Sequence, residues 1–302
     1  MGIKLFTILR NLGEDKYLKY LMLVPAVSIL AFVTIYPFIY SIYLSLYKVT
    51  IQNYFNPPFY GLGNYIEELT SLHFWNSIKV TLTYTALSVL IEFIAGLILA
   101  IIFYEKIGEL DSWWKKILVT VLLAPMMLAP AIVGVIYRMM LNELIGIIPA
   151  YLKSIGIYIP LLTDPTLALL TLVLIDAWQW SPFMFLVIFS GLHSLPSEPV
   201  QAAMVDGASK LQIYKYIVLP LLSPIIAVAI IFRALDAVKA FDTIFLITAG
   251  GPGTATETIS MYIYHRVFTQ GDFGAGAAIT IITLLLLTLI CKFLLKFLYK
   301  VS

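Results

Sequence analysis

The chain has 302 residues, of which 61% are hydrophobic and only 12% are charged. No water-soluble domain of this size is so apolar, so the composition predicts an integral membrane protein surrounded by lipid. The formal net charge of +2 gives no indication of a nucleic-acid partner, and the single cysteine excludes disulfide bonds.

The apolar runs exceed the ~20 residues that a helix needs to cross a bilayer, which favours an all-α fold over a strand barrel. The basic start at 1–19 precedes an apolar run without a small-x-small cleavage site, so we expect a retained first span. One transmembrane domain is therefore expected over 20–302. Its six predicted spans cover residues 20–46, 78–104, 117–140, 166–189, 217–241 and 275–298.

Basic residues distinguish the two sides of the membrane. The N-terminus, the 105–116 and 193–216 segments and the C-terminus together hold twelve Lys and Arg residues. The three loops on the opposite side hold one each, at Lys48, Lys153 and Arg266. Because basic residues accumulate in cytoplasmic loops, both termini and the 193–216 segment are predicted to be cytoplasmic.

A moderately polar stretch at 196–220 interrupts the apolar sequence between the fourth and fifth spans. It predicts two short helical pieces, 200–205 and 209–216, separated by Asp206-Gly207, since glycine supplies the positive φ that ends a helix. Small side chains would let the backbone of a partner approach closely. They belong to Ala202, Ala203, Gly207 and Ala208.

The same stretch resembles a known signature. Gln201-Ala202-Ala203, Asp206-Gly207-Ala208 and Ile217-x-Leu219-Pro220 are similar to the EAA motif of bacterial and archaeal ABC importer permeases. The family usually has Glu where this chain has Gln201, whose amide keeps the size and the hydrogen bonding but loses the charge. The resemblance extends over nearly the whole chain and is greatest to sugar permeases of the maltose, trehalose and glycerol-phosphate type.

This resemblance implies a type I ABC importer permease fold, in which the 196–220 hairpin is a coupling helix seated in a groove of an ATP-binding subunit. It implies as partners a second homologous permease, two ATP-binding subunits and an extracytoplasmic sugar-binding protein, in the cell membrane of a prokaryote. The glycine-rich loop 249–254 lacks the Lys of a Walker A motif. ATP and Mg are therefore expected on the partner ATPase, with no cofactor in this chain.

Catalytic and metal sites are not predicted. His73, His193 and His265 fall in three separate expected loops without the spacing of a metal site. No nucleophile-and-base motif is present, so the chain is expected to be a transporter subunit and not an enzyme.

Polar residues inside spans are costly and tend to line cavities. By helical spacing, one face of the fourth span and one face of the fifth each present such a set, and by resemblance these faces match the sugar contacts of maltose-type permeases. The expected substrate residues are Asp176, Gln179, Trp180, Phe183, Arg233, Asp236 and Ala237. Alternatively, Arg233 and Asp236 form an ion pair that only fixes helix packing.

Other assignments stay open at this stage. Glu92 either lines the path or makes a polar contact between helices, and Lys239 and Asp242 either belong to the site or reach the outer interface. A disaccharide such as maltose or trehalose is the expected substrate, with glycerol 3-phosphate as the alternative because Arg233 suits a phosphate. An ion-coupled secondary transporter using Asp176 or Asp236 would show internal repeats, which we do not find.

Overall fold

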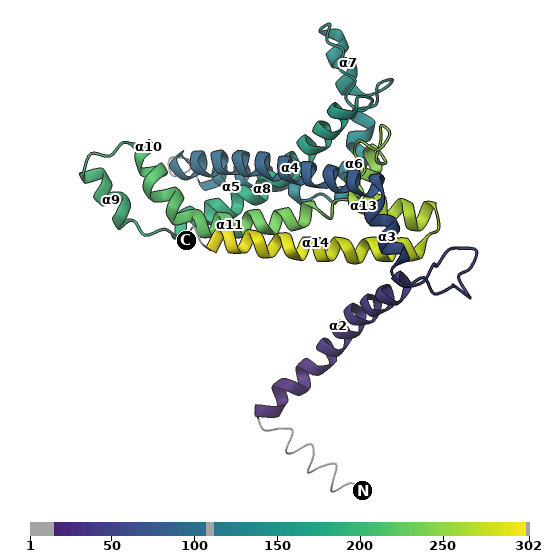
Figure 1. The fold of residues 1–302 in the computed structure, drawn as a ribbon. Helices are drawn as coiled ribbons and strands as arrows, with labels where there is room; N and C mark the ends of the chain where they lie inside the picture. The colour runs from purple at the N-terminus through teal and green to yellow at the C-terminus, as the bar shows by residue number, and fades with distance from the viewer. Residues whose placement is uncertain (1–14, 107–111, 300–302) are drawn as a thin grey trace. The chain divides into compact units, whose positions relative to one another are not determined.

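A computed structural model describes residues 15–106 and 112–299, and the regular secondary structure of this part of the chain is helical (Figure 1). The chain divides into two compact units. The first contains residues 1–68 and 266–282, and the second contains residues 69–265 and 283–302. The predicted cytoplasmic segment 1–19 falls mostly outside the described residues.

Five helices are long and apolar enough to cross a membrane, or up to six spans if one bent pair is counted as a single span. They confirm the expected all-α membrane fold. The helices at the first, second, fourth, fifth and sixth predicted spans are α2 (Asp15–Ser45), α4 (Leu72–Lys106), α8 (Pro165–Ser194), α11 (Leu219–Ala237) and α14 (Phe273–Tyr299).

The third predicted span differs. It is not one continuous helix, because α5 (Ser112–Leu123) and the 3₁₀ turn η2 (Ala124–Met127) are separated from α6 (Pro130–Met140) by a 90° bend, and this bent pair makes the sixth span when it is counted as one. Ala129 adopts an extended conformation with ψ of 137°. A proline disfavours helical geometry in the residue before it, so Pro130 ends one helix and begins the next.

The fifth span begins earlier than expected. α10 (Lys210–Ile213) passes through a π-helical turn, η3 (Tyr214–Val218), directly into α11, and together they form one helix of 28 residues. The helical piece predicted at 209–216 is therefore the start of this span. α11 ends at Ala237, four residues before the predicted limit, and the short helix α12 (Asp242–Ile247) follows.

Three smaller helices complete the second unit. They are α7 (Ile147–Ser154), α9 (Glu198–Val205) and α13 (Ile259–Tyr264). In Figure 1 the hairpin formed by α9 and α10 lies at one end of this unit, and α7 lies toward the opposite end.

The core of the second unit is the pairing of α4 with α8. At Gly96 the helices approach so closely that a Cβ would lie 2.5 Å from Met184 Cβ and 2.8 Å from the backbone nitrogen of Phe185. Apolar side chains of both helices then pack with the start of the fifth span, including Ile188, Ile213 and Leu222. This packing holds α4, α8 and α11 side by side.

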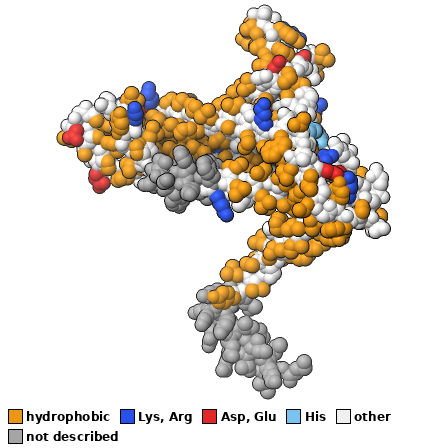
Figure 2. All heavy atoms as spheres, in the orientation of Figure 1, with side chains coloured by type: hydrophobic (Ala, Val, Ile, Leu, Met, Phe, Trp, Pro, Cys, Tyr) orange, Lys and Arg blue, Asp and Glu red, His pale blue; other side chains and the backbone are white. Residues whose placement is uncertain are grey.

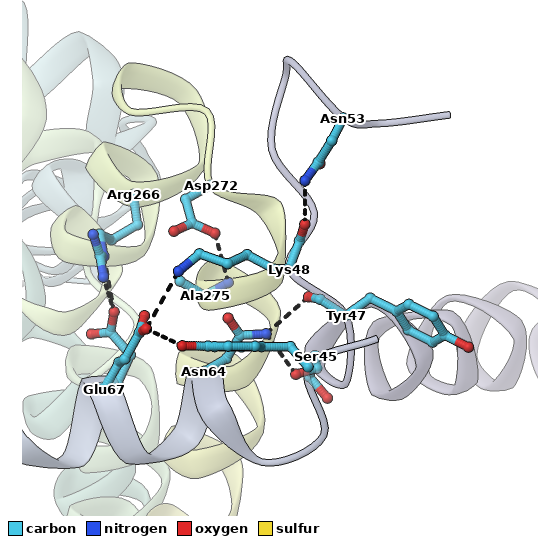
Figure 3. A network of polar contacts seen from close by, with 11 residues as sticks. Ser45, Tyr47, Lys48, Asn53, Asn64, Glu67, Arg266, Asp272 and Ala275 are labelled. Carbon is cyan, nitrogen blue, oxygen red and sulfur yellow. Dashed lines mark hydrogen bonds and ion pairs between the residues drawn. The ribbon is translucent and has the colours of Figure 1, made fainter. Parts of the chain in front are cut away.

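In the first unit, polar contacts join the loop after α2 to α3 (Gly63–Thr70) and to the start of α14 (Figure 3). The Asn64 amide donates to the carbonyls of Ser45 and Tyr47, at 2.8 and 2.9 Å. The π-helical turn η4 (His265–Thr269) contributes Arg266, whose guanidinium pairs with the buried carboxylate of Glu68. These polar contacts hold the loop after α2, α3 and η4 together as one layer of the first unit.

Glu67 in this layer has a pKa below its usual value of 4.5, because Tyr60 donates a hydrogen bond to it and Lys48 lies 3.4 Å away. A lowered folded-state pKa contributes stability above the unfolded pKa, and this stability is lost as pH falls below about 4.5. We expect Glu67→Gln to remove this acid dependence and to destabilise the protein by at most about 1 kcal/mol, since the Lys48–Glu67 pair is exposed. Thermal unfolding midpoints between about pH 3 and pH 7 measure this pH dependence. The same loss of stability at low pH in the variant and in the wild-type protein would contradict the prediction.

Candidate functional site

The centre of the candidate site is the guanidinium of Arg233 on α11. Its Nη2 lies 2.5 Å from Asp176 on α8, its Nε lies 2.9 Å from Glu92 on α4, and its Nη1 lies 3.3 Å from Asp236. Arg233 and Glu92 are buried, with exposed side-chain fractions of 2% and 0%, whereas Asp236 is 46% exposed. One arginine thus joins three helices through carboxylates, and only one of these carboxylates faces open space.

A cavity of about 230 Å³ opens beside this network. The Trp180 ring lines this cavity. The Arg233 guanidinium lies over the same ring, 4.9 Å from its centroid, which is a cation–π contact. The polar and aromatic side chains around the cavity supply acceptors, donors and one apolar ring. They include Tyr84, Asp176, Gln179, Asp236, Lys239 and Asp242.

The structure places five of the seven predicted substrate residues at this cavity and two elsewhere. Gln179 lines the cavity, but its amide also donates to the Leu128 carbonyl at 2.9 Å, in the bend between η2 and α6. Phe183 packs against Phe232 with ring centroids 5.6 Å apart, and Ala237 is buried in the same apolar cluster. The roles of all seven in substrate binding stay predictions.

Sequence reasoning did not find every residue of the cavity. Tyr84 and Thr243 were missed, because a tyrosine and a threonine in apolar helices carry no signal of their own. Lys239 and Asp242 line the cavity beside the predicted site residues, and their role in substrate binding stays a prediction. Glu92 makes a polar contact between α4 and α11, the second of its two expected placements.

The hairpin between α8 and α11 is shaped by its own caps. The Ala208 N–H donates to the Ala203 carbonyl at 2.9 Å and the Gly207 N–H donates to the Met204 carbonyl at 3.1 Å, which is a Schellman end to α9. Gly207 has φ of +78° and open space around it. The Ser209 side chain caps the next helix in a capping box with Gln212.

The hairpin has an inner and an outer face. Ala203 and Ala208 are half-buried against the cluster that contains Ile213, so these two small residues pack on the chain's own core. Gln201, Ala202, Asp206 and Gly207 are exposed. Exposed apolar side chains lie next to them, at Met204, Val205 and Leu211.

Comparison with known proteins decides the family. Residues 93–300 match the family described as the binding-protein-dependent transport system inner membrane component. The chain belongs to this family. It is therefore the permease subunit of an ABC importer, a multi-pass membrane protein, as its EAA-like stretch indicated.

Named relatives have similar lengths. The permease is 34% identical over 275 residues to the trehalose/maltose transport system permease protein MalF of Thermococcus litoralis, covering 90% of each chain. It is 31% identical over 269 residues to the trehalose transport system permease protein SugA of Mycobacterium tuberculosis, covering 89% of this chain and 84% of SugA.

A solved structure shows the same fold. A bacterial ABC transporter chain, from a transporter involved in the import of the acidic polysaccharide alginate, superimposes on the permease with a TM-score of 0.80. The match covers 98% of this chain and 99% of that chain at 24% identity. This match confirms the permease fold.

Two histidines of the permease lie together, contrary to the expectation from their separate sequence positions. The buried carboxylate of Glu257 contacts the imidazole of His73 at the start of α4 and, at 2.6 Å, that of His265. His193 also differs from its expected loop position, since it belongs to the last turn of α8. Within the described residues, no group of three or more acidic, His or Cys side chains is arranged to hold a metal ion.

Proposed function

We propose that this permease takes up a sugar, a disaccharide such as maltose or trehalose, within an ATP-driven importer. One observation carries the proposal: the polar cavity lies between α8 and α11, and α11 continues without a break into the exposed hairpin. One continuous helix therefore connects the polar cavity with an exposed surface that a partner subunit can contact.

The cavity chemistry suits a sugar. Sugar hydroxyls bind carboxylates and amides, which Asp236 and Gln179 supply, and the apolar face of a sugar ring packs on an aromatic ring such as that of Trp180. Relatives named as trehalose and maltose permeases support a disaccharide. The volume of about 230 Å³ favours one sugar ring in this cavity at a time.

Glycerol 3-phosphate is supported less well. A phosphate would need Arg233, and that guanidinium is already paired with Glu92, Asp176 and Asp236. Membership of a binding-protein-dependent family also disfavours an ion-coupled secondary transporter that would use Asp176 or Asp236 as a relay. No specific observation favours glycerol 3-phosphate as the substrate or an ion-coupled mechanism.

The proposed mechanism is mechanical. A separate ATP-binding subunit, which holds the ATP and Mg, contacts the outer face of the hairpin at Gln201, Ala202, Asp206 and Gly207. Closure of two such subunits moves α10, and the continuous helix transmits this motion to Arg233 and Asp236. A second homologous permease and an extracytoplasmic sugar-binding protein complete the proposed assembly, with the hairpin and both termini in the cytoplasm.

We expect Asp236→Ala to slow uptake of the transported sugar by roughly tenfold or more. Asp236 is the half-exposed acid of the network, and a hydrogen bond to a charged group contributes about 1.5–3 kcal/mol, where 1.4 kcal/mol is a factor of ten. Uptake of radiolabelled maltose, trehalose and glycerol 3-phosphate into cells that express the whole importer measures the effect and identifies the substrate.

Phe183→Leu tests the predicted residue that lies on the same face of α8 in sequence but packs outside the cavity. Uptake equal to that of the wild-type permease would remove Phe183 from the predicted site. Unchanged uptake of every substrate in Asp236→Ala would remove the cavity from the transport path.

A further inference from the structure

The segment that contains α7 has an unusual surface for an extramembrane connection. It joins α6 to α8, and its helix α7 has only 8 residues and is too short to cross a bilayer, yet large apolar side chains protrude from the segment. Leu144 is 94% exposed, Ile145 is 83% exposed and Tyr151 is 66% exposed. Ile147, Ile155 and Tyr158 continue this surface, called here the α7 surface, and Figure 2 shows the hydrophobic colour over the projecting lobe.

The exposed apolar residues are held in place by an ordered turn. The Asn142 side-chain oxygen accepts hydrogen bonds from the backbone N–H groups of Leu144 and Ile145, at 3.0 and 3.2 Å. The Gly146 N–H donates to the Asn142 carbonyl at 2.7 Å. The turn satisfies its backbone internally and directs two large side chains outward.

Polar side chains of the segment form hydrogen bonds within the segment itself. Lys153 donates to the Glu143 carbonyl at 3.1 Å, and the Glu143 carboxylate accepts from Thr163 at 2.7 Å. On the core side, Ile148 packs against the apolar cluster of the unit. Polar groups thus form hydrogen bonds within the segment, while Ile and Leu side chains face outward. A loop in water shows the opposite arrangement, with polar side chains facing the solvent.

We propose that the α7 surface lies on the membrane, at the leaflet opposite the hairpin, with Ile145, Ile147 and Tyr151 among the lipid headgroups and upper acyl chains. The two helices that this segment joins also expose apolar side chains, including Ile136 of α6 and Leu174 of α8. Tyr151, Tyr158 and Lys153 are residue types that anchor at the interface between membrane and water.

A lipid surface fits better than a soluble partner. Protein interfaces carry about one hydrogen bond per 100–200 Å², whereas the polar groups of Asn142, Glu143 and Lys153 are engaged within the segment. A lipid surface requires no hydrogen bonds from the α7 surface.

Spin labels can locate this surface in the complete importer. The importer is reconstituted in vesicles of phosphatidylcholine and phosphatidylglycerol without binding protein, in a Cys291→Ser background, and single cysteines replace Ile145 or Tyr151. Collision of the label with oxygen is compared with collision with a water-soluble nickel chelate. Ile136→Cys is the lipid reference and Asn56→Cys, on an exposed loop residue, is the aqueous reference.

We expect oxygen to be favoured over nickel at both α7 positions, toward the Ile136 value, with a depth of roughly 5–10 Å. Nickel accessibility equal to that at Asn56 would place the surface in water and overturn the proposal. An immobilised label that neither reagent reaches would show a protein cover, such as the second permease, and would also overturn it. If Ile145→Cys lowers the yield, Leu144 takes its place.

Discussion

Gly207→Asp is expected to reduce sugar transport to background and to abolish substrate-stimulated ATP hydrolysis, while the permease still inserts and assembles. Gly207 has φ of +78° and no atom within 4 Å of where a Cβ would lie, so a Cβ at this position clashes with nothing in this chain. The left-handed conformation costs a non-glycine residue at most about 1–2 kcal/mol. If the variant no longer couples ATP hydrolysis to sugar transport, the cause is a disturbed contact between the hairpin and its partner subunit. Vesicle uptake and ATPase rates of the reconstituted importer measure both effects.

Gly156→Asp is the matched control. Gly156 has the same φ of +78° and the same open space, so the substitution introduces the same backbone strain and the same charge. It lies just after α7, at a distance from the hairpin, and should leave substrate-stimulated ATP hydrolysis intact. If Gly207→Asp retained normal coupling, or if both variants lost it equally, the hairpin would not be the coupling element.

The fold could be predicted from the sequence where one local signal dominated. Apolar runs of about 20 residues located the spans, and Asp206-Gly207 located the end of α9, because both depend on nearby residues only. The 90° bend before Pro130 was missed, although the proline was visible in the sequence. Prolines are tolerated inside membrane helices, so a proline alone does not distinguish a kink from a break.

The site was predicted where helical spacing places polar residues on one face of each helix. Asp176, Gln179 and Trp180 of α8 line the cavity, as do Arg233 and Asp236 of α11. The pairing of Glu92 with Arg233 joins residues that are 141 positions apart in the sequence. The residue pattern along one helix does not show which residues of another helix it contacts. Phe183 shares the predicted face but lies beyond the cavity, because the spacing gives a direction around the helix axis and not a depth along it.

The network around Arg233 explains why sequence reasoning found two alternatives there. Arg233 pairs with two buried acids as well as with half-exposed Asp236. The buried pairs join α4, α8 and α11, while Asp236 is the partner of Arg233 that is most exposed at the cavity. We propose that the buried pairs serve helix packing and that Asp236 serves substrate contact, and substitution can separate the two proposed roles.

Arg233→Met is expected to destabilise the permease by about 3–5 kcal/mol, because it leaves the buried carboxylates of Glu92 and Asp176 without their cation. Adding Glu92→Met should restore part of this loss, with a coupling of about 0.5–3 kcal/mol between the two sites. Unfolding midpoints of the purified importer, at fixed protein and lipid concentration, measure the effects.

Asp236→Asn separates stability from transport in the same cluster. Its side chain is 46% exposed, so the loss of its charge should cost at most about 1 kcal/mol of stability. Its uptake should nevertheless fall, as in Asp236→Ala, because the cavity loses the exposed carboxylate that is paired with Arg233. Additive effects of Arg233→Met and Glu92→Met would show that the two side chains do not form a stabilising pair. A large loss of stability in Asp236→Asn would instead assign the third carboxylate to helix packing, and would leave the cavity without the acid on which sugar recognition is proposed to depend.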